Sequence, residues 1–208
     1  MLFIYNPQGV GDVLMVVVAD DQGQAVEVEK KGAIARVRRA DNEETVAWNF
    51  FQVSDRLILE GSGQQNLSDA DLVILNDWLA AEGFEERVAN FDSPRFVVGQ
   101  IVEMEAHPDS DHLNICQVAV GQDKTVQIVA GAPNARVGLK TIVALPGAMM
   151  PKGNLIFPGQ LRGVASFGMM CSPRELALPN APQKRGIIEL AEETPVGQAF
   201  DPAKHWSA

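Results

Sequence analysis

The sequence predicts an α+β domain over residues 1–90, followed by an all-β domain over residues 91–208. The first part combines β-rich segments with one pattern typical of an amphipathic helix, whereas the second contains only short β-rich segments between glycines and prolines. A turn-forming segment at residues 90–94, Asn-Phe-Asp-Ser-Pro, separates the two parts. Hydrophobic residues make up 46% of the chain and charged residues 21%, as is typical of a globular protein with a packed core.

In the first part, β-rich or alternating segments are separated by turn-forming clusters, and the expected strands are residues 12–19, 26–30, 33–38 and 45–51. Ser68 and Asp71 then have the spacing of a capping box. The helix that follows is expected to end at Gly83. Its apolar face consists of Leu72, Leu75, Trp78 and Leu79. We therefore expect one helix that packs on a sheet.

The second part contains short β-rich segments at residues 96–102, 113–120, 125–129, 141–145, 167–170 and 187–190. Their length and spacing favour a closed all-β barrel or a sandwich over parallel βαβ units. Closure of a barrel also removes exposed sheet edges.

The net charge of −10 is distributed unevenly. Residues 1–90 carry 7 Lys and Arg against 16 Asp and Glu, whereas residues 91–208 carry 10 against 11. A nearly neutral domain can still present a basic face, because binding depends on the local potential. The acidic balance of the whole chain therefore neither predicts nor excludes binding of nucleic acid.

Several classes of protein are not predicted. No apolar run reaches the ~18–20 residues that span a bilayer, and the N-terminus lacks the basic region of a secretory signal. The two cysteines, Cys116 and Cys171, form no CxxC motif and are too few for a disulfide framework. We expect a cytoplasmic protein with reduced thiols and no membrane segment.

Residues 107–112, His-Pro-Asp-Ser-Asp-His, are the most concentrated group of titratable side chains. Two imidazoles and two carboxylates suit a divalent metal, which a metal-dependent hydrolase would need. Proline and short Asp/Ser runs are also common turn formers, because their side chains accept bonds from nearby amides. We interpret the segment as a turn, with a metal site as the alternative.

Two further segments carry candidate binding residues. Residues 130–134, Ala-Gly-Ala-Pro-Asn, predict a barrel corner or a loop that brings backbone and an amide close to a ligand. Residues 159–172 contain an arginine suited to phosphate, a hydroxyl and a flexible methionine between glycines. The alternative is a glycine-bent strand whose Met and Cys lie in the core. The candidate side chains are Asn134, Arg162, Ser166 and Met169.

No catalytic or nucleotide-binding motif appears in the chain. The patterns GxSxG, HExxH, GxxxxGK[ST] and the Rossmann fingerprint are absent, and no Ser/His/Asp order is identifiable. The sequence therefore predicts neither an enzyme nor a cofactor.

The ordered motifs resemble the tRNA-binding domain shared by the bacterial phenylalanyl-tRNA synthetase β subunit, methionyl-tRNA synthetase extensions and EMAP II-like cytokine precursors. The matching segments are residues 97–101, 107–113, 128–134, 138–140, 161–163 and 166–176. The resemblance covers about residues 96–190. The arrangement of an α+β domain before this barrel resembles the YtpR family of free-standing tRNA-binding proteins.

This resemblance implies an OB-fold, a five-stranded barrel that binds tRNA through one face and its loops without catalysis. It implies contacts at Ser166, Met169, Cys171 and Asn134, with Arg162 and Lys140 as phosphate contacts by position and chemistry. Relatives often place Lys where this chain has His112, so one basic contact becomes dependent on pH.

Two alternatives concern partners. In a protein–protein adaptor, the acidic domain would dock on a basic partner such as a synthetase or the ribosome, because a fold alone does not fix function. Free-standing relatives often form homodimers, which adds a homodimer as an open possibility.

Overall fold

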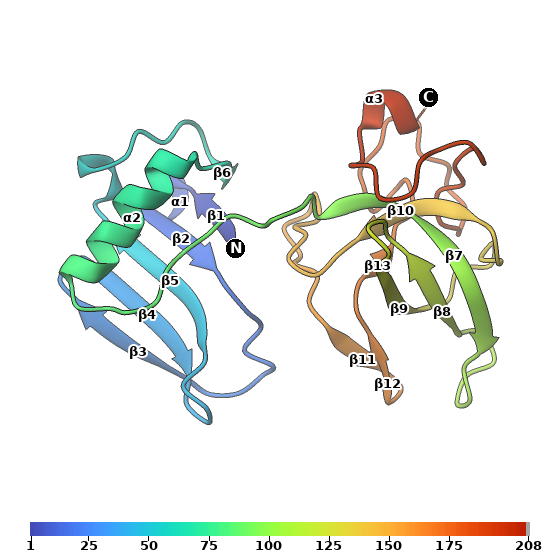
Figure 1. The fold of residues 1–208 in the computed structure, drawn as a ribbon, viewed down its shortest axis with the longest axis horizontal. Coiled ribbons are helices and arrows are strands. Elements are labelled where there is room, and N and C mark those ends of the chain that lie inside the picture. The colour runs from blue at the N-terminus through green and yellow to red at the C-terminus, as the bar shows by residue number, and fades with distance from the viewer. Residues whose placement is uncertain (207–208) are drawn as a thin grey trace. The chain divides into compact units, whose positions relative to one another are not determined.

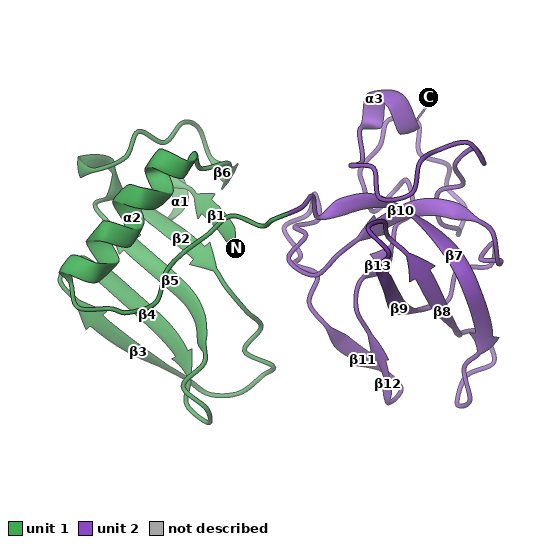
Figure 2. Ribbon diagram, in the orientation of Figure 1, with its two compact units in different colours: residues 1–92 green, residues 93–208 purple. Residues whose placement is uncertain are grey.

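The computed structural model describes residues 1–206. The chain forms two units, unit 1 over Met1–Asp92 and unit 2 over Ser93–Ala208 (Figure 2). No helix in residues 1–206 has both the length and the apolar character needed to cross a membrane.

Unit 1 is a six-stranded antiparallel sheet with a helix across one face (Figure 1). The strand order is β3-β4-β5-β2-β1-β6. The elements are β1 (Leu2–Tyr5), α1 (Pro7–Val10), β2 (Val13–Val17), β3 (Val26–Lys31), β4 (Ile34–Arg39), β5 (Thr45–Phe51), a 3-10 helix (Val53–Asp55), β6 (Gly63–Gln65) and α2 (Asp69–Ala81). The α+β prediction is confirmed, although β1 and β6 were not expected from the pattern.

The core of unit 1 lies between α2 and the sheet. Residues of β5 alternate between buried and half-buried positions, so that Trp48 and Phe50 point into this layer. Trp78 of α2 lies 5.6 Å from the Phe50 ring, measured between centroids. The capping box is confirmed, because Ser68 Oγ accepts a bond from the Asp71 amide at 3.2 Å while Asp71 accepts from the Ser68 amide at 2.9 Å.

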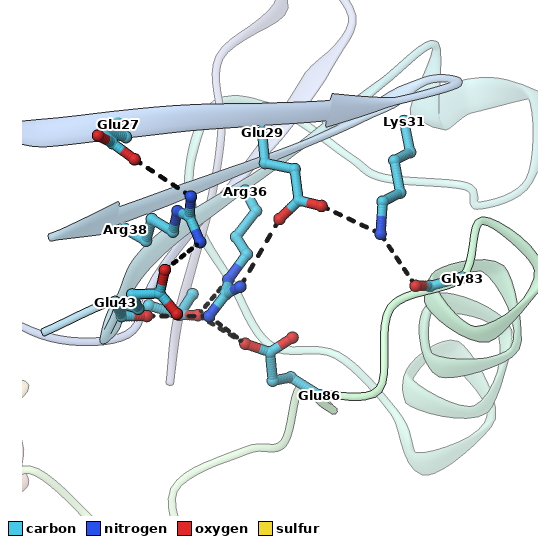
Figure 3. Close-up of polar contacts among 9 residues, drawn as sticks. Glu27, Glu29, Lys31, Arg36, Arg38, Glu43, Gly83 and Glu86 are labelled. Carbon is cyan, nitrogen blue, oxygen red and sulfur yellow. Dashed lines mark hydrogen bonds and ion pairs between the residues drawn. The ribbon is translucent and has the colours of Figure 1, made fainter. Parts of the chain in front are cut away.

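Ion pairs link β3 and β4 to the segments that surround them (Figure 3). The cross-strand registers Glu29↔Arg36 and Glu27↔Arg38 place opposite charges side by side. Arg36 bonds Glu86, which follows α2, at 2.6 Å. Glu29 also pairs with Lys31 at 3.1 Å, and the pKa of Glu29 is lowered chiefly by the hydrogen bond from Lys31. Lys31, Arg36 and Arg38 are thus matched by carboxylates of the same unit.

Unit 2 is a nearly closed antiparallel barrel of the OB type. Its five-stranded sheet has the order β13-β10-β7-β8-β9, and a separate hairpin pairs β11 with β12. The elements are β7 (Phe96–Ala106), β8 (Asn114–Ala119), β9 (Thr125–Ala130), β10 (Lys140–Ala144), β11 (Gly159–Leu161), β12 (Val164–Ser166), β13 (Met169–Met170) and α3 (Pro202–His205). The predicted five-stranded all-β barrel is confirmed, and residues 187–190 contribute only an isolated bridge, Lys140↔Leu190.

The barrel closes where the chain runs from β12 past β9 to β13. The Phe167 amide donates to Gln127 O at 2.8 Å, and Gln127 Nε2 donates to Ala165 O at 2.7 Å. Gly168 has a φ of +143°, and a Cβ there would lie 2.8 Å from Ala144 O. Only glycine allows this close approach, which brings the following residues onto β10.

Candidate nucleic-acid interface

The corner after β9 is held in place by Asn134. Its Nδ2 donates to Ile187 O and Glu189 Oε1, both at 2.9 Å, and its Oδ1 accepts from the Ile187 amide at 3.0 Å. These bonds fix the segment around Ile187 against the corner. The side chain predicted to meet RNA is therefore already occupied in positioning the backbone.

The predicted contact segment from β12 to β13 has side chains on both sides of the barrel wall. Ser166 is buried, and its Oγ accepts a bond from the Val129 amide at 3.1 Å. Cys171 is fully buried, and burial raises the pKa of its thiol to about 12. Met169 is half-buried, whereas the Phe167 side chain is 43% exposed. Met169 and Phe167 therefore offer this segment's apolar surface to a ligand.

The two predicted phosphate contacts differ in their freedom. Arg162 is exposed and donates one bond, from Nη1 to Asp109 O at 2.8 Å, so that most of its donors remain available. Lys140 Nζ donates to the backbone oxygens of Glu192 and Thr194, the latter at 2.8 Å. Lys140 thereby fastens the C-terminal segment to β10.

Residues 107–112 form the turn between β7 and β8. His107 is buried; its Nδ1 accepts from the Asp109 amide at 3.0 Å, and its Nε2 lies 3.1 Å from Leu161 O. His112 is exposed and lies 2.8 Å from Asp111, whose pKa is lowered by that hydrogen bond. Residues 1–206 contain no cluster of three or more His, Cys, Asp or Glu side chains arranged to hold a metal ion.

Two grooves meet beside Met169. The first groove has a volume of about 410 Å³ and lies between the corner after β9, the segment at Arg185 and the turn that follows β13. The second groove, of about 490 Å³, extends from this turn to the loop that carries Lys152. Both are lined by Met169, Ser172, Arg174 and Glu175.

Within the part of the chain that the structure describes, the lysine and arginine side chains around these grooves have no carboxylate partner. Within residues 1–206, the side chains of Arg174 and Lys152 make no hydrogen bond or ion pair, and Arg185 donates only to Gly131 O, at 3.2 Å. Glu175 adds one negative charge, and its Oε2 accepts from the Ser172 amide at 2.7 Å. The edge of the grooves therefore has a surplus of exposed positive charge.

Sequence reasoning did not select Arg174, Arg185 or Lys152 as site residues. Arg174 lies inside one of the matching motifs, residues 166–176, and its exposed position beside Met169 is a consequence of the turn after β13. Arg185 and Lys152 lie in irregular segments whose position on the barrel depends on long-range contacts. An exposed lysine or arginine in a loop carries no local pattern that distinguishes it.

The chain matches two family models. Residues 96–199 match the "Putative tRNA binding domain", and residues 21–90 match a "Domain of unknown function". The chain is 40% identical to the "Putative tRNA-binding protein YtpR" of Bacillus subtilis, over 94% of this chain and 97% of that protein.

Other relatives match only part of the chain. The phenylalanine–tRNA ligase β subunit of Rhodospirillum rubrum is 53% identical over 49% of this chain, which corresponds to 12% of that subunit. Among solved structures, the C-terminal domain of Plasmodium vivax p43 aligns with 53% of this chain and 61% of its own, at 21% identity and a TM-score of 0.37. The chain belongs to the YtpR-like family and carries the tRNA-binding domain that this family shares with the phenylalanyl-tRNA synthetase β subunit.

Proposed function

We propose that the protein binds tRNA in the cytoplasm without catalysing a reaction, through the face of unit 2 that carries the two grooves. The observation that supports this most strongly is a set of exposed cations around these grooves that have no carboxylate partner among residues 1–206: Arg174, Arg185 and Lys152. Phosphate contacts of this kind supply much of the affinity of proteins for nucleic acid. The family match adds the nature of the ligand.

The predicted contacts take two roles in this proposal. Arg162 and Met169 meet the RNA directly, because both offer accessible atoms. Asn134, Lys140, Ser166 and Cys171 shape the surface by holding the corner, the C-terminal segment and the β12–β13 path. The exposed ring of Phe167 offers a flat apolar surface on which an unpaired base can stack, an interaction worth about 1–3 kcal/mol per base.

A titration of the full-length protein with bulk bacterial tRNA tests the proposal. With three to four phosphate contacts, the logarithm of the association constant falls against the logarithm of salt concentration with a slope of about −2 to −3. Measurements by fluorescence anisotropy at about 50 and 200 mM salt give this slope. Absence of binding at the lower salt concentration refutes the proposal.

Arg162→Glu is the matched test of the surface. It should weaken tRNA binding while circular dichroism shows an unchanged fold, because the residue is exposed. Lys124→Glu makes the same change of charge at the turn before β9, at the opposite end of that strand from the first groove. Equal loss of affinity in both variants means that the effect is general electrostatics and not contact at this face.

The acidic unit 1 supports one other function, a protein adaptor that docks on a basic partner such as a synthetase or the ribosome. Affinity capture from a cell extract, with and without nuclease, separates the two functions. Association carried by tRNA disappears on digestion, whereas direct docking of unit 1 survives it.

A further inference from the structure

We infer that the first groove is a subsite for one unpaired nucleotide, whose phosphate lies between Arg174 and Arg185 and whose base packs against Met169. This inference rests on the proposed function and assigns it a specific contact. Both arginines and Met169 line the same groove of about 410 Å³. Its volume lies within the range of about 300–1,000 Å³ that holds small ligands.

One wall of the groove is the segment that carries Arg185. Asn134 binds the backbone of Ile187 through both its amide nitrogen and its oxygen, at 2.9 and 3.0 Å. Gly186, which lies in the sequence between Arg185 and Ile187, has a φ of +144°, and a Cβ there would lie 3.0 Å from the Asn134 side chain. The strained conformation and the close approach both require glycine. Arg185 therefore extends from a backbone that is fixed to the barrel corner.

Another part of the lining is the turn that carries Arg174. Ser172 and Glu175 close this turn with reciprocal bonds: the Ser172 amide donates to Glu175 at 2.7 Å and the Glu175 amide donates to Ser172 Oγ at 3.3 Å. The next residue, Leu176, is buried in the core of unit 2 and anchors the end of the turn. Arg174 is thus an exposed side chain on an anchored backbone.

The donors of these two arginines select an anion. A guanidinium has five N–H donors in a planar fork that matches the oxygens of a phosphate. Arg185 uses one nitrogen on Gly131 O, and Arg174 has no polar partner within residues 1–206. The carboxylate in the lining, Glu175, is already bonded to the Ser172 amide. Two cations against one carboxylate favour a phosphate over a metal ion or an ammonium group.

The remaining lining suits a base. Met169, Pro133 and the buried Ile128 give the groove an apolar side next to its charged rim. A thioether makes favourable contact with aromatic rings, and a methionine adapts to different bases. A base held in a helix is stacked and paired, so only an unpaired nucleotide can place both base and phosphate here.

The test uses the full-length protein and an unstructured single-stranded RNA hexanucleotide as the probe, measured by calorimetry. Arg174→Gln and Arg185→Gln should each weaken its binding about tenfold, as loss of a charged hydrogen bond does. If both hold one phosphate, the double variant should lose clearly less than the roughly hundredfold product of the two single effects. Lys124→Gln, which removes a charge at the distant β8–β9 turn, serves as the control and should leave the affinity unchanged.

Two further probes check the chemistry. A hexanucleotide with uncharged methylphosphonate linkages should bind much more weakly than the natural one, because it lacks the anion. Met169→Ala should lower affinity about twofold to tenfold if its sulfur contacts the base. An acidic hexapeptide should not compete with the RNA probe.

The outcomes separate this inference from the proposed function. If tRNA binds but the two arginine variants combine as the full product, they contact different phosphates and the single-nucleotide subsite is wrong. The subsite is also wrong if the acidic peptide competes or if the hexanucleotide does not bind while tRNA does. If the wild-type protein fails to bind tRNA at low salt, the proposed function itself is wrong.

Discussion

The ion-paired cations on β3 and β4 of unit 1 differ from the cations around the grooves of unit 2. In unit 1, Lys31, Arg36, Arg38 and Arg39 each form ion pairs with carboxylates of the same unit. In unit 2, Arg174 and Lys152 beside the grooves have no polar partner within residues 1–206, and Arg185 bonds only to the backbone oxygen of Gly131. A cation beside a carboxylate contributes little potential to the surrounding solvent, whereas an unmatched one attracts an anion. Whether individual cations are ion-paired is therefore a better guide to an anion-binding surface than the net charge of the chain.

The largest effect that this comparison predicts is on tRNA affinity. Combined Arg174→Glu and Lys152→Glu should reduce affinity about hundredfold, because two charged contacts are lost. The matched pair in unit 1, Lys31→Glu with Arg38→Glu, makes the same change of charge and should alter affinity less than about twofold. Fluorescence anisotropy with labelled tRNA measures both. A similar loss in both double variants shows that net charge, and not the state of pairing, governs binding.

The second prediction concerns stability, for which the substitution in unit 1 should have a larger effect than the one in unit 2. Arg36 is only 16% exposed and bonds Glu86 at 2.6 Å and Thr45 Oγ1 at 2.7 Å. Arg36→Ala should lower the free energy of unfolding of unit 1 by about 1–3 kcal/mol, because charged hydrogen bonds are removed from a partly buried network. Arg174→Ala, at an exposed residue whose side chain has no polar partner in the described part of the chain, should change stability by less than about 0.5 kcal/mol.

Urea unfolding followed by tryptophan fluorescence checks this prediction, because Trp48 and Trp78 are buried in the core of unit 1. Arg174→Ala is the matched control within the same chain. If Arg36→Ala leaves the unfolding midpoint where it was, the ion pairs of Figure 3 contribute nothing to stability, and the contrast between the units is only geometric.

Local patterns in the sequence were sufficient to predict the main strands and the helix, but not the side-chain contacts between them. The alternation around Trp48, the capping box at Ser68 and the spacing of short strands predicted the sheet, the helix and the barrel, because each depends on neighbouring residues. The pairing of Arg36 with Glu29 depends on the register of two strands and a reverse turn. Its contact with Glu86 depends on how α2 ends, which no local pattern encodes.

The candidate site shows the same limit. Motifs located the corner at Asn134 and the strand at Ser166, and the family resemblance implied that both side chains contact RNA. In the structure both are occupied in bonds to backbone atoms, at Ile187 and Val129. Whether a polar side chain serves the fold or the ligand depends on which backbone groups lie beside it, and this is set by tertiary contacts.

The third prediction is a loss of stability in unit 1 on acidification. The pKa of Asp41 is lowered chiefly by its hydrogen bond from Arg39, and the pKa of Glu29 is lowered chiefly by that from Lys31. A carboxyl with a lowered pKa in the folded state stabilises the protein above its ordinary pKa and loses that contribution as pH falls through the folded value. The urea concentration at half-unfolding, reported by the tryptophans, should therefore decrease when the pH is lowered below about 4.5, the ordinary pKa for Glu29.

Asp41→Asn with Glu29→Gln is the matched variant for the acid transition. It should show a lower midpoint at neutral pH and a smaller further decrease between neutral and acidic pH. A wild-type midpoint that does not change below pH 4.5 contradicts the contribution of these two ion pairs.

The smallest expected effect is that of Cys171 on tRNA affinity. It tests the difference between this buried residue and the accessible Met169 of the same segment. Burial raises the pKa of the Cys171 thiol to about 12 and that of Cys116 to about 11, so neither forms a reactive thiolate near neutral pH. Cys171→Ala should change tRNA affinity less than about twofold, because a fully buried side chain touches no ligand, while the lost packing lowers stability. Met169→Ala, two residues earlier, should lower affinity more. If a thiol reagent labels Cys171 in the folded protein without RNA, the thiol is accessible in the free protein and the contrast between the two residues is wrong. If Cys171→Ala weakens binding as much as Met169→Ala does while the thiol resists labelling, this segment opens when RNA binds.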